Sequence, residues 1–72
     1  NEQLELALSE LQKANELDPD LPQVYLGLGM VYRLQGRKTE AIQNLQRYLE
    51  LSEDPEWRAQ AEAALRQLQE EQ

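Results

Sequence analysis

The sequence predicts an all-α domain whose helices pair as antiparallel hairpins of a solenoid. Three observations lead to this fold class. Apolar residues recur at helical spacing in four separate segments. Proline, glycine and aspartate stand between these segments, where helices begin and end. The first and third segments repeat each other with a step of 34 residues, from Ala7 to Ala41 and from Leu17 to Leu51, and paired helices with such a period indicate a solenoid.

The composition narrows the classes of function. The chain has 72 residues and a net charge of −7, from 14 acidic and 7 basic side chains. We expect neither nucleic acid nor a membrane as partner, because phosphate groups attract basic surfaces and no apolar run reaches about 20 residues. Histidine and cysteine are absent, so no nucleophile–base pair of the usual kind can form, and the acidic residues lack calcium-loop spacing. The sequence therefore predicts no enzyme, no metal site and no cofactor.

The first predicted helix covers residues 4–18. Its apolar side chains share one face, while polar side chains occupy most of the other; the apolar set is Leu4, Ala7, Leu8, Leu11, Ala14 and Leu17. Pro19 ends this helix, because proline disfavours the α conformation in the residue before it.

The second predicted helix, residues 21–35, is apolar on nearly every side. Such a helix is either buried or carries a binding surface. We expect Asp20 to cap its first turn and Pro22 to be tolerated there, since the first N–H groups have no partner within the helix. Gly27 costs this helix about 1 kcal/mol relative to alanine, and it either permits a close approach or has no role. Gly36 is expected to end the helix in the left-handed conformation.

The third predicted helix, residues 39–51, repeats the first. One bulky residue departs from that repeat, because Tyr48 stands where the first helix has Ala14. Protein interiors are densely packed, so we expect Ala61 or Ala64 to make room for the tyrosine ring.

The last predicted helix, residues 56–70, begins after Asp54 as the N-cap and Pro55 at the first helical position. Its apolar stripe starts at Trp57. This placement favours a position at the edge of the core over a role as a binding anchor. Arg58 is expected on a solvated face of the helix.

Together these residues resemble the tetratricopeptide repeat. The segments that match one complete repeat are Tyr25, Leu28-Gly29, Tyr32, Gly36, Glu40-Ala41-Ile42, Leu45 and Leu49-Glu50-Leu51. Residues 4–18 are similar to the second helix of a preceding repeat. The resemblance implies a right-handed solenoid of about one and a half repeats, in which residues 21–35 and 39–51 form the complete repeat and residues 56–70 a capping helix. The second Asp-Pro pair lies two residues later than the period of 34 requires.

The resemblance also implies a function in protein–protein interaction. Members of this family bind peptides or partner helices in a concave groove lined by the first helices of successive repeats. Here the corresponding positions are Gln23, Leu26, Met30, Arg33 and Leu34. Leu26 and Met30 stand where chaperone-binding members carry a polar clamp, so an apolar or helical ligand is expected. The same two side chains could instead pack against a neighbouring first helix, and the alternative function is a structural cap of a solenoid with no peptide ligand.

Self-association is a further expectation for the isolated chain. Because the first helix lacks the partner that would precede it in a repeat, its apolar residues Leu4, Leu6 and Leu11 would need cover from a second copy, as in a homodimer. The chain begins at Asn1 rather than methionine. We therefore expect residues 1–72 to be a single domain taken from a longer scaffold or adaptor.

Overall fold

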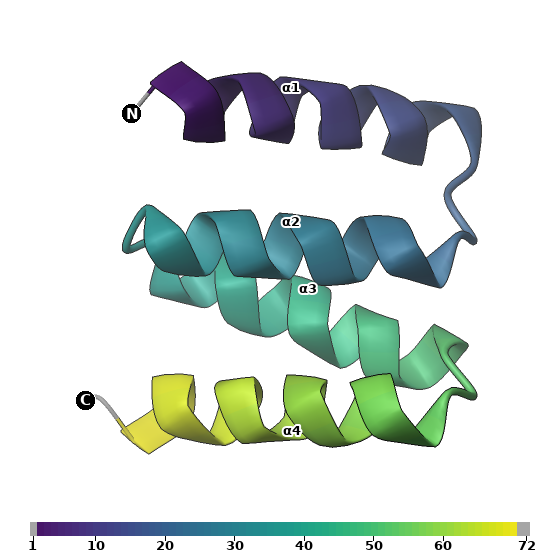
Figure 1. Ribbon diagram of the computed structural model, residues 1–72, viewed down its shortest axis with the longest axis vertical. Coiled ribbons are helices and arrows are strands. Elements are labelled where there is room, and N and C mark those ends of the chain that lie inside the picture. Colours follow the sequence, from purple (N-terminus) through teal and green to yellow (C-terminus); the bar gives the residue numbers. More distant parts are fainter. Residues whose placement is uncertain (1, 71–72) are drawn as a thin grey trace.

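The computed structural model describes residues 2–70, which form four α-helices joined by short turns (Figure 1). The helices are α1 (Glu2–Leu17), α2 (Pro22–Leu34), α3 (Lys38–Leu51) and α4 (Pro55–Glu70). Each packs mainly on the next along the chain, α1 on α2, α2 on α3 and α3 on α4. Successive helices run in opposite directions, so α2 and α4 point the same way (Figure 1). The all-α class of antiparallel hairpins is confirmed, with every bound within two residues of its prediction.

The turn between α1 and α2 corrects one prediction. Asp20 is not the N-cap of α2; that position belongs to Leu21, whose backbone is extended and whose side chain cannot accept a hydrogen bond. The backbone N–H of Asp20 donates instead to Oδ1 of Asp18 at 3.3 Å. This local turn ends before the helix starts, which leaves Asp20 one residue too early to cap it. Pro22 occupies the first turn as expected.

The end of α2 follows the prediction closely. Gly36 has a φ of +76°, in the left-handed region. Its N–H donates to the carbonyl of Arg33 at 3.1 Å, and the N–H of Arg37 donates to the carbonyl of Tyr32 at 2.9 Å. These two bonds form a Schellman motif, which satisfies carbonyls that the helix leaves unpaired and for which glycine is the favoured residue.

The start of α4 is also capped as predicted. Oδ1 of Asp54 accepts hydrogen bonds from the backbone N–H groups of Glu56, at 3.0 Å, and Trp57, at 3.4 Å. Pro55 is the first residue of the helix. The aspartate therefore satisfies two of the N–H groups that no helical carbonyl can reach.

Arg58 does not lie on a solvated face, so that prediction was wrong. Its Nη1 donates to the backbone carbonyls of Leu49 and, at 2.8 Å, Ser52. Both carbonyls lie at the end of α3, where the helix has no further N–H groups to offer. A cation there also interacts favourably with the helix dipole. The first turn of α4 thus stabilises the end of α3.

The core lies where α2, α3 and α4 meet. Its buried cluster consists of Val24, Leu28, Tyr32, Ala41, Leu45, Tyr48, Ala61, Ala64 and Leu68. Tyr48 shares this cluster with the two alanines that the sequence offered as its small neighbours. Gly29 permits the close contact of α2 with α3, since a Cβ there would lie 2.8 Å from Cγ of Leu45.

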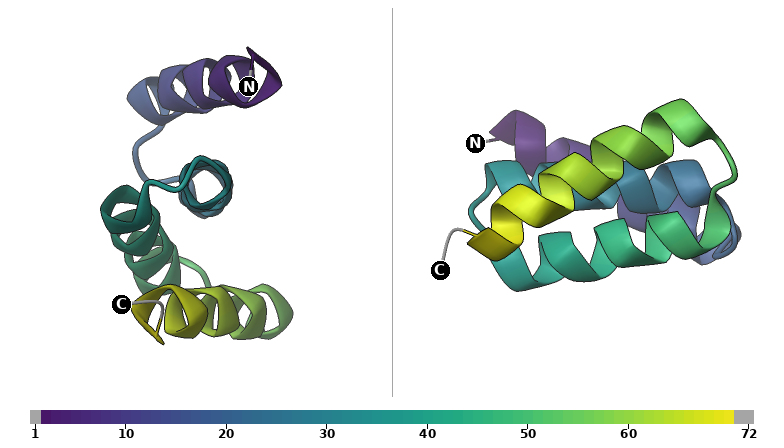
Figure 2. Two further views of the ribbon diagram at one scale, coloured as in Figure 1. Left: turned by 90° about the vertical axis from the view of Figure 1, so that its left-hand side faces the viewer. Right: turned by 90° about the horizontal axis from the view of Figure 1, so that it is seen from below.

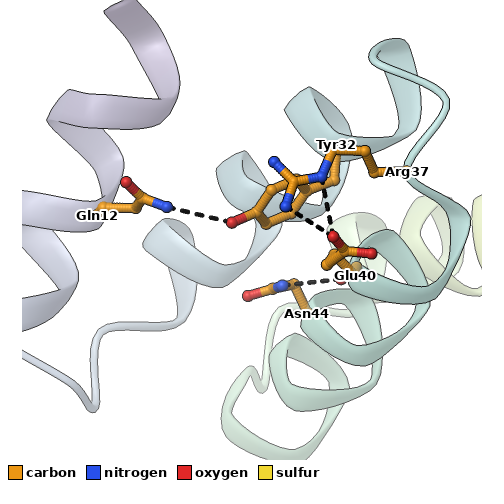
Figure 3. Close-up of polar contacts among 5 residues, drawn as sticks. All are labelled: Gln12, Tyr32, Arg37, Glu40 and Asn44. Atoms are coloured by element: carbon orange, nitrogen blue, oxygen red, sulfur yellow. Dashed lines mark hydrogen bonds and ion pairs between the residues drawn. The ribbon is translucent and has the colours of Figure 1, made fainter. Parts of the chain in front are cut away.

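A set of polar contacts joins α1, α2 and α3 (Figure 3). Nε2 of Gln12 donates to the hydroxyl of Tyr32 at 3.2 Å, and the guanidinium of Arg37 lies 4.6 Å from the centre of the same ring. Arg37 also forms an ion pair with Glu40 at 2.7 Å. The Arg37 hydrogen bond, aided by a backbone hydrogen bond, holds the pKa of Glu40 below its ordinary 4.5. Asn44 donates to the Glu40 backbone carbonyl at 2.8 Å.

Helix α1 is the least covered of the four. None of its described residues is buried, Leu6 is 62% exposed and Leu17 is 82% exposed. Leu4 and Leu11 are half-buried. Leu11 rests on Gly27 of α2, where a Cβ would lie 2.8 Å from its Cδ2. Gly27 therefore permits the close approach of α1, and of the three leucines proposed for self-association only Leu6 is largely exposed.

Candidate partner-binding groove

A groove of about 670 Å³ opens between α2 and α4. Both helices pack on α3, and the end-on view shows α3 set to one side of them (Figure 2). Three residues of α2 line the groove: Leu26, Met30 and Arg33. The lining from α4 is Trp57, the alanines Ala61, Ala63 and Ala64, and the longer polar side chains Gln60, Arg66, Gln67 and Glu70.

The middle of the groove is apolar. Leu26 is half-buried, Met30 is 40% exposed and Trp57 is 50% exposed. Across from Leu26 and Met30, on the same helix as Trp57, Ala61 and Ala64 are buried and have short side chains, so this part of the α4 wall is low. Large apolar side chains that stay accessible beside a low wall leave room for apolar groups of another molecule.

The position of Trp57 corrects the prediction that it closes the core edge. Trp57 does continue the apolar stripe of α4, one turn before Ala61. Trp57 therefore lies in the first turn of the helix, where it is half exposed and does not belong to the core cluster. It lines both the groove and a smaller adjoining hollow of about 290 Å³, which Tyr48 and Ser52 also line.

The two ends of the groove differ in their polar groups. Near the ends of α2 and α4, Nη2 of Arg33 donates to Oε1 of Gln67 at 2.5 Å and joins the two helices. Arg66 and Glu70 line the same end. Near the starts of these helices, the smaller hollow carries the Asp54 carboxylate among neutral groups. A ligand lying along the groove therefore meets different charges at its two ends.

The structure brings four of the five predicted groove residues together. Leu26, Met30 and Arg33 line the groove, and Gln23 lines the smaller hollow that shares Leu26 and Trp57 with it. Leu34 does not line the groove. It is 71% exposed and borders another hollow beyond the end of the groove, which it shares with Arg33.

The α4 side of the groove was missed in the sequence, although the repeat contained the signal for it. Each of four α2 residues has a counterpart 34 positions later that lines the same space: Gln23 and Trp57, Leu26 and Gln60, Met30 and Ala64, Arg33 and Gln67. The second Asp-Pro pair is displaced by two residues, yet α4 keeps the period of the repeat. Applying the 34-residue step to the predicted α2 positions would have located the opposite wall.

Two further features bear on the class of site. Within residues 2–70, no three carboxylate side chains come close enough to hold a metal ion. None of the four helices described here combines the length and apolarity needed to cross a membrane.

Comparison with known proteins identifies the family. A family model described as TPR repeat matches residues 1–36, and one described as tetratricopeptide repeat matches residues 22–55. No curated protein and no solved structure gives a significant match. Repeats of this family generally mediate protein–protein interaction and are typically non-enzymatic. The first match covers half of the chain and the second covers the complete α2–α3 hairpin, so the chain belongs to the tetratricopeptide repeat family.

Proposed function

We propose that this chain is a protein–protein interaction module that binds a peptide or partner helix in the groove between α2 and α4. In this proposal it serves a larger scaffold or adaptor and catalyses no reaction. The observation that carries it is the set of accessible apolar side chains in the groove, Leu26, Met30 and Trp57. On a chain with a net charge of −7, such a concave apolar surface is the best available contact for a partner.

The alternative is a structural cap, in which Leu26 and Met30 stabilise the stack of helices. The groove favours binding instead. The residues of α4 follow those of α2 by 34 positions, so α4 stands where a neighbouring helix would cover Met30, yet Met30 remains 40% exposed. Under the binding proposal α4 forms the far wall of the groove.

Selection from a random peptide display library tests the proposal. The chain should enrich peptides that shift the emission of Trp57, its single tryptophan. The variant Leu26→Glu with Met30→Gln should lose those peptides and keep its helical circular dichroism. Leu17→Gln is the matched control, because it removes a leucine that is 82% exposed outside the groove.

The outcomes separate the two functions. Loss of the peptides with an unchanged melting temperature supports the groove. A large fall in melting temperature, with no peptide enriched by the parent chain, would instead support the structural cap.

A further inference from the structure

One end of the groove carries basic side chains, although the protein as a whole has a net negative charge. Acidic side chains outnumber basic ones by 14 to 7, yet Arg33 and Arg66 line the groove with Glu70 as the acidic member of its lining. Lys38 joins Arg33 in the hollow directly beyond that end. At the opposite end the charged group is the carboxylate of Asp54. A partner is therefore met by positive charge at the end where α2 and α4 finish.

The basic end keeps its charge available. Arg33 bonds to Gln67, a neutral amide, so its positive charge is not cancelled by that contact. The two ion pairs found among the described residues involve Arg37 and Arg47, neither of which lines the groove. Each groove arginine suits an acidic side chain of a partner, since guanidinium groups match carboxylates geometrically.

The middle of the groove selects the conformation of the partner. An extended peptide must pair its own N–H and C=O groups when it is buried. Here the middle offers the side chains of Leu26, Met30 and Trp57, and the lining backbone of α2 and α4 is already paired within helices. A helix satisfies its backbone internally and needs only an apolar face, and methionine adapts to the shape of such a face.

From these features we infer that the partner is an amphipathic helix with acidic side chains beyond one end of its apolar stripe. The stripe packs on Leu26, Met30 and Trp57, and the acidic side chains lie at Arg33 and Arg66. This inference rests on the proposed function, because it names the partner of the same groove.

Three synthetic peptides without tryptophan test it. The first is a helix of leucine, alanine and glutamine with two glutamates beyond one end of the leucine stripe. The second has two lysines in place of the glutamates, and the third is the first with a central proline. Binding is followed through Trp57 emission and through the anisotropy of a label on the peptide. Each exposed ion pair changes affinity by up to about fivefold, so the first peptide should bind about tenfold more tightly than the second at low salt.

The test is decided by which peptide binds more tightly, the one with glutamates or the one with lysines. The overall charge of −7 would favour the lysine peptide, whereas the groove charges favour the glutamate peptide. The preference should shrink at high salt, where screening is stronger. It should disappear in Arg33→Gln with Arg66→Gln. It should persist in Lys13→Gln with Arg47→Gln, which removes the same charge from exposed positions outside the groove. Circular dichroism checks that both variants fold.

Other outcomes overturn the inference in distinguishable ways. Equal binding of the first two peptides, with both lost in Leu26→Glu, would leave the proposed function standing and refute the acidic partner. Equal binding of the proline peptide would show that the ligand is extended. Displacement of the first peptide as the protein concentration rises would identify a second copy as the occupant. If no peptide shifts Trp57 emission, both the proposed function and the inference fail.

Discussion

Replacing Gly29 with alanine measures how closely α2 and α3 pack. The new Cβ would lie 2.8 Å from Cγ and 2.9 Å from Cδ2 of Leu45. Carbon atoms in contact prefer separations of about 3.5–4.0 Å. Leu45 has no exposed surface, so its side chain has no free space into which it can move. Overpacking of this kind costs about 1–3 kcal/mol.

Helix propensity acts in the opposite direction. Alanine is more favourable than glycine in a helix interior by about 1 kcal/mol. The net effect of Gly29→Ala is therefore a loss of about 0–2 kcal/mol in the free energy of unfolding. For a domain of this size, 1 kcal/mol corresponds to a fall of roughly 4–8 °C in melting temperature.

Gly27→Ala is the matched control, two residues away on the same helix. Its Cβ would lie 2.8 Å from Cδ2 of Leu11, which is the end of a half-buried side chain on the outer helix α1. That end can rotate away, so the gain in propensity should leave the stability unchanged or raised.

Comparing Gly29→Ala with Gly27→Ala isolates the energy of packing at Gly29. Both variants gain the same propensity, which cancels in their difference, so Gly27→Ala should be about 1–3 kcal/mol more stable than Gly29→Ala. Urea unfolding followed by circular dichroism gives both values. If Gly29→Ala unfolds at the same urea concentration as Gly27→Ala or a higher one, the contact of Gly29 with Leu45 is not rigid and the reasoning is wrong.

Three other predictions follow from the core, from the ion pair and from α1. Ala64→Leu should lower the free energy of unfolding by about 1–3 kcal/mol in thermal melts, because it overpacks the cluster that contains Tyr48; an unchanged melting temperature would refute that contact. The folded pKa of Glu40 is below 4.5, so its carboxylate stabilises the fold above that pH and the contribution is lost as the pH falls further. Glu40→Gln should therefore lose less stability than the parent chain between about pH 5 and about pH 3. The parent chain should self-associate, with a light-scattering mass that rises above 8.4 kDa with concentration, and Leu6→Glu should reduce that rise; a constant mass would show that α1 needs no cover.

The fold was largely predictable because its signals are local. Helical spacing of apolar residues needs no knowledge of the partner surface. The end of α2 likewise depends on local bonds, from Gly36 to the residue three positions before it and from Arg37 to the residue five positions before it. Asp20 shows where local signals compete. Aspartate suits both helix caps and turns, and the turn made by Asp18 decided the outcome.

The candidate groove was only half predictable, because it depends on contacts between distant helices. Periodicity placed Trp57 on the apolar stripe of α4, but periodicity does not show how much of that stripe the other helices cover. Arg58 looked like an ordinary surface charge, since the carbonyls it caps belong to α3 and become neighbours only in the folded chain. Gly27 had no apparent role until α1 lay against it.

The order in which the helices pack has a consequence for folding. The main contacts of the fold join helices that are adjacent in the sequence, so no long loop must close before the core can form. The α2–α3 hairpin contributes most of the buried side chains, whereas α1 contributes none. Local opening should therefore start at α1, and its amide protons should exchange with solvent well before those of α2 and α3. A partner that binds between α2 and α4 would then slow exchange in those two helices and leave α1 free to open.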